Sequence, residues 1–178
     1  RAMLQLYRNT FEEKYLKYSC ESLEFINHNF RDNYYGFYNK ITSENDNTCP
    51  RQIDENISLT RFANLLSFYS KEKRFNNISK HGLKYLSIPE IATARIEEAG
   101  ILLIDRETQS SPLTIDINGH VNNKLVMNFI DIAHRQKGWY KLIRFNKSED
   151  ISASIEIEGF KSKFVKTPDE LRQLLLTY

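Results

Sequence analysis

Few cysteines and no paired cysteine motif occur in this chain of 178 residues. Its two cysteines, Cys20 and Cys49, stand far apart, and neither belongs to a C-x-x-C pair. Two reduced thiols in a reducing compartment are the expectation for such a pattern. A Cys20–Cys49 disulfide is the alternative, which sequence alone leaves open.

Long apolar runs and basic blocks are absent as well. No apolar run approaches the ~18–20 residues of a membrane-spanning helix, and the first residues lack the apolar core and cleavage site of a signal peptide. Lys and Arg (25) nearly balance Asp and Glu (23), without a basic cluster. We therefore expect a cytoplasmic location, with no membrane or nucleic-acid partner. The helical character of the first residues further suggests that Arg1 is not a natural start.

The stretch from Ser58 to Leu86 shows the clearest pattern in the chain. Apolar residues recur at helical spacing on both sides of a polar turn at residues 70–73. Two amphipathic helices joined in this way form a hairpin that buries one face against further hairpins. Residues 3–30 repeat the pattern, with Thr10 and Glu13 spaced as a capping box for a helix from about Phe11. The weak repeat indicates an array of helical hairpins.

An aromatic segment around Gly36 and a polar stretch separate these two hairpins. Tyr35 and Phe37 either close the end of the helical bundle or line a pocket. Arg51, Asp54 and Glu55 precede the second hairpin, and we expect the two acids to be loop residues. Adjacent carboxylates on an extended loop point apart, whereas glycoside chemistry needs a pair ~5–9.5 Å apart across the substrate.

The hydrophobic period changes near Ser110. Before it, the sequence predicts one helix that begins at Pro89 and ends at about Asp105 to Thr108, with Ile96 and Leu103 on its apolar face. After it, alternating apolar residues predict strands at 113–118, from 140, at 151–157 and near 164–165. Helices are expected from Asn122 or Asn123 to about Arg135, and after Thr167. We thus predict two domains, helical hairpins over 1–109 and a small α/β subdomain over 110–178.

The segment 116–123, D-I-N-G-H-V-N-N, is the sharpest short motif. It resembles the D-x-x-G-H-V-N-N segment that opens the central helix of hot-dog acyl thioesterases. That resemblance implies positioning of an acyl thioester by Asn118, His120 and Asn123. The alternative interpretation makes His120 a polar turn residue and Asn122 and Asn123 helix-capping candidates.

A wider resemblance covers most of the chain. L-Q-L-Y-R-N-T-F-E-E-K-Y-L, N-H-N-F-R-D-N-Y-Y-G-F-Y-N, the hairpin at 62–86, S-S-P-L-T-I-D-I-N-G and T-P-D-E-L-R-Q-L-L-L occur in the order seen in thioredoxin-domain-containing proteins related to the spermatogenesis-associated proteins. The resemblance is to their C-terminal part and implies hairpins of a six-hairpin α/α toroid followed by a small α/β terminus. The thioredoxin domain and most of the hairpins are absent here, so redox activity is not implied.

These patterns lead to a mainly α fold, a partial α/α toroid, followed by a small α/β subdomain. We predict a non-catalytic structural or binding part of a larger protein of unknown activity. The alternatives are a carbohydrate-binding or sugar-modifying toroid, with Tyr35, Phe37, Arg51, Asp54 and Glu55 at its mouth, and the acyl thioesterase. The expected partner is the missing N-terminal part of the parent protein or a second copy, with a sugar as possible ligand.

His28, His81 and His134 lack metal-ligand spacing and are expected on helix surfaces or interfaces, so no metal or cofactor is predicted.

Overall fold

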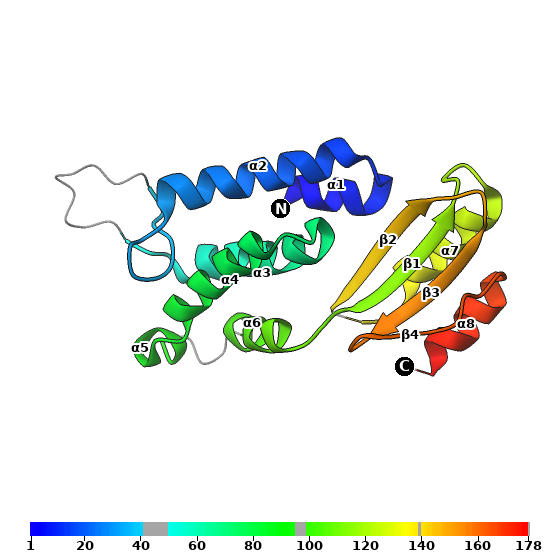
Figure 1. Ribbon diagram of the computed structural model, residues 1–178. Coiled ribbons are helices and arrows are strands. Elements are labelled where there is room, and N and C mark those ends of the chain that lie inside the picture. Colours follow the sequence, from blue (N-terminus) through cyan, green and yellow to red (C-terminus); the bar gives the residue numbers. More distant parts are fainter. Residues whose placement is uncertain (41–49, 95–98, 139, 178) are drawn as a thin grey trace. The chain divides into compact units, whose positions relative to one another are not determined.

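A computed structural model describes residues 1–40, 50–94, 99–138 and 140–177. Figure 1 traces two compact units, Arg1–Gln109 and Ser110–Tyr178. Unit 1 contains only helices and their connections among its described residues, and unit 2 combines a four-stranded sheet with two helices. The predicted order of helices followed by an α/β part is therefore confirmed. Within the described residues, no helix combines the length and apolar character needed to cross a membrane.

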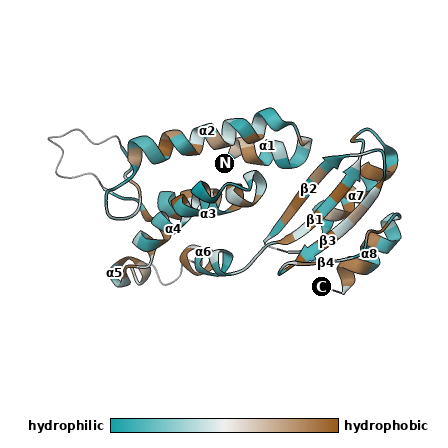
Figure 2. Ribbon diagram, in the orientation of Figure 1, coloured by the Kyte–Doolittle hydropathy of each residue, from teal (hydrophilic) through white to brown (hydrophobic). Residues whose placement is uncertain are grey.

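Two helical hairpins form most of unit 1. The first consists of α1 (Ala2–Thr10) and α2 (Glu13–Phe30), and the second of α3 (Ile53–Ser70) and α4 (Lys73–Leu86). In Figure 2 these helices carry hydrophobic residues in patches alternating with hydrophilic ones, as expected for amphipathic helices. The helices α3 and α4 approach closely at Gly82. A Cβ added there would lie only 2.0 Å from Thr60 Oγ1, so the position has no room for a side chain.

The start of α2 differs from the prediction. Thr10 is the last residue of α1, where its hydroxyl donates to the carbonyl of Leu6 at 2.9 Å. The N-cap of α2 is Glu12, which makes no side-chain cap, so the predicted capping box between Thr10 and Glu13 is wrong. The left-handed conformation of Phe11 (φ 56°) turns the chain there, and a turn of this kind is invisible to a spacing rule.

The second hairpin begins earlier than predicted. The helix α3 starts at Ile53, so Asp54 and Glu55 lie in its first helical turn and the expectation of loop acids is wrong. Acidic side chains near a helix N-terminus interact favourably with the helix dipole, which accounts for the longer helix. Lys71 adopts the left-handed conformation (φ 60°) and ends α3, in agreement with the predicted turn.

The region after the second hairpin holds two helices instead of the single one predicted. The short helix α5 (Pro89–Ala92) ends at Thr93, and α6 (Gly100–Gln109) begins after the undescribed residues. Ile96 lies outside the described residues. Burial on α6 centres on Ile104, which is fully buried in a cluster with Ile57, Tyr85 and Leu86. Leu103 is only partly buried, because the shorter helix turns a different face to α3.

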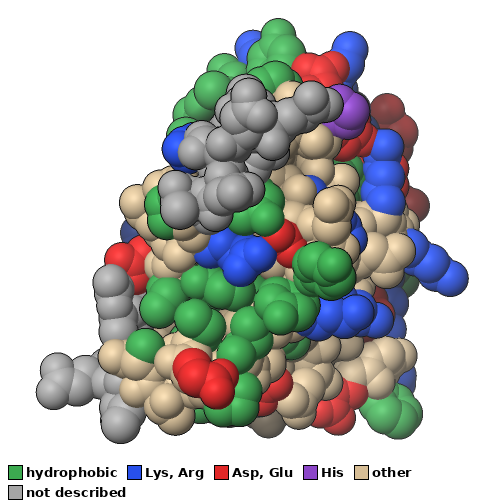
Figure 3. Space-filling model, turned by 90° about the vertical axis from the view of Figure 1, so that its left-hand side faces the viewer, with side chains coloured by type: hydrophobic (Ala, Val, Ile, Leu, Met, Phe, Trp, Pro, Cys, Tyr) green, Lys and Arg blue, Asp and Glu red, His purple; other side chains and the backbone are tan. Residues whose placement is uncertain are grey.

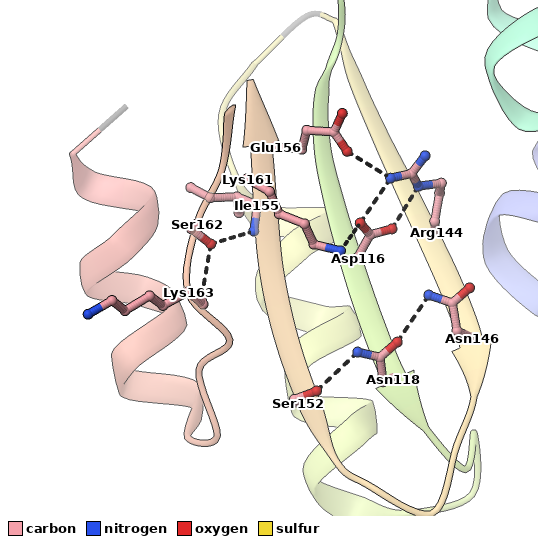
Figure 4. A network of polar contacts seen from close by, with 10 residues as sticks. All are labelled: Asp116, Asn118, Arg144, Asn146, Ser152, Ile155, Glu156, Lys161, Ser162 and Lys163. Carbon is pink, nitrogen blue, oxygen red and sulfur yellow. Dashed lines mark hydrogen bonds and ion pairs between the residues drawn. The ribbon is translucent and has the colours of Figure 1, made fainter. Parts of the chain in front are cut away.

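Unit 2 is built around a mixed sheet with the strand order β2-β1-β3-β4. The central strand β1 (Leu113–Gly119) pairs parallel with β2 (Lys141–Lys147) and antiparallel with β3 (Ser152–Ile157). The helix α7 (Lys124–Arg135) connects the parallel strands, and β4 (Phe160–Lys161) and α8 (Pro168–Leu176) complete the unit. Alternation along β1 gives the sheet two different faces. Ile115 and Ile117 belong to the fully buried apolar core, whereas polar side chains occupy the face turned away from α7 (Figure 4).

Both helices of unit 2 are capped by side chains. The Asn123 side chain accepts a hydrogen bond from the backbone N–H of Leu125 at 2.8 Å, as the capping interpretation predicted. Thr167 and Glu170 form a complete capping box with Pro168 in the first turn of α8. These caps depend only on residues close in sequence, so spacing was sufficient to find them.

Candidate functional site

A buried carboxylate organises the segment that follows α2. Asp32 is 3% exposed, and its Oδ1 accepts the backbone N–H groups of Tyr34 (2.7 Å) and Tyr35 (3.0 Å). Its Oδ2 accepts Arg51 Nη2 at 2.6 Å and the hydroxyl of Tyr38. Burial alone would raise the pKa of Asp32, but the hydrogen bonds from Tyr38, Arg51 and the two amides outweigh it and hold the pKa well below its ordinary value. Asp32 is therefore a charged residue whose hydrogen bonds hold this segment in place.

Arg51 lies among three tyrosine rings. Its guanidinium carbon is 5.0 Å from the ring centroid of Tyr38, 5.7 Å from that of Tyr85 and 5.8 Å from that of Tyr35. The Tyr85 hydroxyl also donates to the Arg51 carbonyl at 3.1 Å. Such contacts combine cation–π attraction with apolar cover for the arginine stem. Arg51, two residues before α3, thus connects the segment 34–38 to Tyr85 of α4.

Asn56 and Gly36 fix the backbone of the same segment. The Asn56 side chain accepts the N–H of Phe37 at 2.8 Å and donates to its carbonyl at 2.9 Å, as a neighbouring strand would. Gly36 has φ 77°, and a Cβ added there would lie 2.7 Å from Tyr85 Cβ. Position 36 therefore requires glycine for its conformation and for its close approach to α4.

His81 is buried where α4 contacts residues 31–36, so of the two expected places, a helix surface or an interface, it occupies an interface. The side chain is 6% exposed, with Nδ1 3.0 Å from Arg31 Nη2 and Nε2 3.1 Å from the Gly36 carbonyl. Because a guanidinium only donates, Nδ1 accepts and the Nε2–H donates to the carbonyl. Burial and the nearby Arg31 charge lower the pKa of His81. The ring is therefore neutral and structural.

A cavity of about 220 Å³ opens beside this segment, between α2 and α3. The described part of its lining includes Ile26, Phe30, Phe37, Tyr38, Asn39, Glu55, Asn56 and Leu59. Among the described residues, the Glu55 carboxylate has no hydrogen-bond or ion-pair partner. The Oδ1 atom of Asn39 is buried without a hydrogen bond. An apolar, aromatic pocket with a few unused polar groups is the usual form of a small-molecule site.

The sequence-predicted residues divide between two neighbouring places in unit 1. Arg51 and Tyr35 lie together in the tyrosine cluster, whereas Phe37 and Glu55 line the cavity. Asp54 is exposed and does not line it. Figure 3 views this end of unit 1, where hydrophobic side chains gather beside Lys or Arg side chains. Tyr34 is 78% exposed there and Tyr35 38%.

Three contributors were missed by sequence reasoning. Asp32, Asn56 and Tyr85 hold the segment through contacts that span 19 to 34 residues of chain. The only available signal was the position of Asp32 at the head of the aromatic D-N-Y-Y-G-F-Y string. An aspartate before a turn favours an Asx turn of the kind observed.

A second polar cluster lies on the face of the sheet in unit 2 that is turned away from α7 (Figure 4). Asp116 is 4% exposed and accepts both Arg144 Nε (2.7 Å) and Nη2 (2.9 Å). Arg144 also reaches Glu156 at 3.1 Å, and Lys161 lies 3.5 Å from Asp116. Two acids and two bases therefore compensate one another, which leaves this face without a net charge for a ligand.

The residues of the thioesterase interpretation make separate contacts. Asn118 accepts Asn146 Nδ2 at 3.1 Å and donates to Ser152 Oγ at 3.0 Å. Exposed His120 has Nε2 3.4 Å from Glu149 Oε1, and Asn123 caps α7. The strand pair flanking α7 is parallel, whereas a hot-dog fold wraps an antiparallel sheet around its helix. Acyl-thioester chemistry stays a prediction.

Cys20 is half-buried on α2, and burial raises its pKa to about 11. Such a thiol is a weak nucleophile at neutral pH. The alternative disulfide involves Cys49, which lies outside the described residues. In the described ranges, no cluster of three or more His, Cys, Asp or Glu side chains is arranged to hold a metal ion.

Comparisons with known proteins add no assignment. A scan against models of protein families finds no match, and a search of curated proteins finds no similar sequence. The resemblance to the thioredoxin-domain-containing proteins therefore stays a prediction.

Proposed function

We propose that the chain is a non-catalytic binding part of a larger protein and that the cavity of unit 1 takes a sugar-class ligand. The observation that carries this proposal is an aromatic cavity lined by exposed Glu55, whose carboxylate has no partner among the described residues, and by Asn39, whose Oδ1 is buried without a hydrogen bond. Phe30 and Phe37 supply apolar faces for the C–H side of a sugar ring. Glu55 and Asn39 supply hydrogen-bond acceptors for its hydroxyl groups.

The size of the cavity favours a small ligand. Drug-sized ligands occupy pockets of about 300–1,000 Å³, whereas this cavity measures about 220 Å³. One sugar ring or a comparable polyol is the appropriate class.

The carboxylates near the cavity support binding over hydrolysis. Glycoside hydrolysis uses two carboxyl groups placed about 5–9.5 Å apart across the bond. Only Glu55 among the described acids lines the cavity. Both oxygens of Asp32 already accept hydrogen bonds, and exposed Asp54 lies outside the lining. A sugar would therefore be held without a second carboxylate to attack it.

The helical hairpins would belong to an incomplete α/α toroid, as the family resemblance implies. Support comes from apolar side chains left exposed on the first hairpin, including Leu6 (41%), Tyr18 (48%) and Phe25 (59%). Further hairpins of the parent protein, or a second copy of the chain, would cover such residues.

The ligand is tested by isothermal titration of the full chain with a panel of monosaccharides and disaccharides. We expect millimolar or tighter binding of at least one sugar. A hydrogen bond to a charged group contributes about 1.5–3 kcal/mol, so Glu55→Gln should weaken that binding about tenfold or more.

Glu90→Gln is the matched control, because Glu90 is an exposed first-turn acid of α5 that does not line the cavity. It should bind sugar as the wild type does. Absence of binding to every sugar at millimolar concentration, or equal binding by Glu55→Gln, would refute the proposal.

A further inference from the structure

Unit 1 contains a second hollow, of about 370 Å³, between the end of α3 and one side of α4. Four polar residues of α4 line it, namely Lys73, Asn76, Asn77 and Lys80. Their spacing of three, four and seven residues places them on one face of the helix. Phe68 and Lys71 contribute from the α3 side. The α4 side of the hollow is therefore lined by a stripe of polar side chains, and the α3 side contributes an aromatic side chain.

The charges around this hollow are unbalanced. Lys71, Lys73 and Lys80 form no ion pair within the described part of the chain. Glu72 is the only carboxylate among the described lining residues, and Arg74 Nε lies 2.6 Å from it. Arg74 also pairs with Glu24, so one arginine is shared by two carboxylates. The described lining therefore holds three lysine charges without an ion pair against the single carboxylate of Glu72.

The N-terminus of α4 adds to the positive potential. Its first turn contains no acidic residue, and the N-cap Glu72 makes no side-chain cap. Two cations, Lys73 and Arg74, open the helix, although the helix dipole favours anions at this end. Cations at this end are unfavourable for the isolated helix, and an anion in the hollow would offset that cost.

We propose that this hollow binds the phosphate group of a small phosphomonoester. The ammonium groups of the three lysines would form charge-assisted hydrogen bonds to the phosphate oxygens. The amides of Asn76 and Asn77 would donate further bonds, and Phe68 would contact the organic part of the ligand. A small ligand fits better than a polynucleotide, because these cations gather at one hollow and the net charge of the chain is only +2.

The test uses the full chain at low ionic strength, with phenyl phosphate and inorganic phosphate as probes in separate titrations. Both should bind saturably at millimolar concentration or below, and added salt should weaken them. The Lys73→Gln/Lys80→Gln double variant should bind about tenfold or more weakly, because each lysine near a charged ligand contributes a few-fold, about 1 kcal/mol or more. Lys73→Gln removes a cation from a helix N-terminus, so we expect no loss of fold.

Lys84→Gln is the control, because exposed Lys84 lies on the same helix outside the lining. It should retain wild-type affinity. Three outcomes would overturn the proposal: no saturable binding of either phosphate, an equal loss in Lys84→Gln, or binding of a single-stranded oligonucleotide without binding of the small phosphates. The sugar titration uses another cavity and different variants, so either proposal can fail alone.

Discussion

Asp32 in unit 1 and Asp116 in unit 2 are both almost fully buried, at 3% and 4% exposed, and both pair with an arginine. Their surroundings differ. Asp32 lies in a segment outside the helices, and its carboxylate accepts two backbone N–H groups of that segment. Asp116 lies in the central strand β1, whose backbone pairs with strands on both sides.

The difference shows which part of the backbone is held by side-chain hydrogen bonds. In the sheet, the ladder of backbone hydrogen bonds holds the chain, and Asp116 connects side chains on one face. In unit 1, residues 31–38 have one isolated bridge, between Arg31 and Phe37, and a few backbone hydrogen bonds. The side chains of Asp32, Asn56 and Arg51 add the remaining contacts that hold this segment. The wall of the cavity in unit 1 therefore depends in part on a few polar side chains, and the loss of one of them should be costly.

The largest expected effect is that of Asp32→Asn. In the described part of the chain, Asp32 is the only carboxylate paired with Arg51. Removing one partner of a buried pair costs about 3–5 kcal/mol, and the partial exposure of Arg51 favours the lower end of that range, about 3 kcal/mol. Thermal unfolding measures the loss, and hydrogen exchange should show opening of residues 31–38 first.

The same substitution should alter the pH dependence. The folded-state pKa of Asp32 is depressed from 3.8, so its contribution to stability is present above that value. The contribution is lost as pH falls further toward the folded pKa. Wild-type stability should therefore decrease below about pH 4 more steeply than that of Asp32→Asn. Parallel curves of stability against pH for the two proteins would contradict the assignment of Asp32 as a charged residue that holds the segment.

A somewhat smaller effect is expected for Gly36→Ala. Left-handed backbone strain costs a non-glycine residue about 1–2 kcal/mol, and the clash with Tyr85 adds to it. Gly159→Ala in unit 2 is the matched control, because Gly159 has φ 84° with nothing within 4 Å of the added Cβ. Gly36→Ala should lower the free energy of unfolding by more than the control does. The measurement is urea unfolding, with hydrogen-exchange data to separate the two units. Equal losses in the free energy of unfolding for the two variants would show that the contact of position 36 with α4 does not contribute to stability.

The smallest effect is that of Asp116→Asn. Arg144 retains Glu156 at 3.1 Å, and the exposed Lys161 regains water. The sheet ladder is unchanged, so we expect a loss of about 1 kcal/mol, near the range of partly exposed pairs. A loss greater than that of Asp32→Asn would reverse the comparison between the two units.

The elements that sequence identified correctly depend on local patterns. Alternation predicted β1 and β3, and the spacing of Thr167 and Glu170 predicted the capping box of α8. Both patterns involve residues within a few positions of one another. The coarse division of the fold follows from such signals.

The wrong or missing predictions concern positions whose structure is determined by the turn of the backbone or by contacts between residues far apart in the sequence. Spacing suggested a capping box at Thr10, but the backbone turn at Phe11 moved the helix start to Glu13. Glu55 was recognised as a candidate, although in a loop and not in the first turn of α3. The partners of Asp32 could not be found, because Arg51 is 19 residues away in the chain and no local pattern connects them.

The most direct test of the account is an NMR titration of the full chain with the tightest-binding sugar of the panel. The account predicts chemical-shift changes at residues that line the cavity in unit 1, including Phe37, Asn39 and Glu55. Glu55→Gln should reduce these changes at equal sugar concentration. Chemical-shift changes centred on the sheet face around Asp116, with unit 1 unaffected, would contradict this prediction.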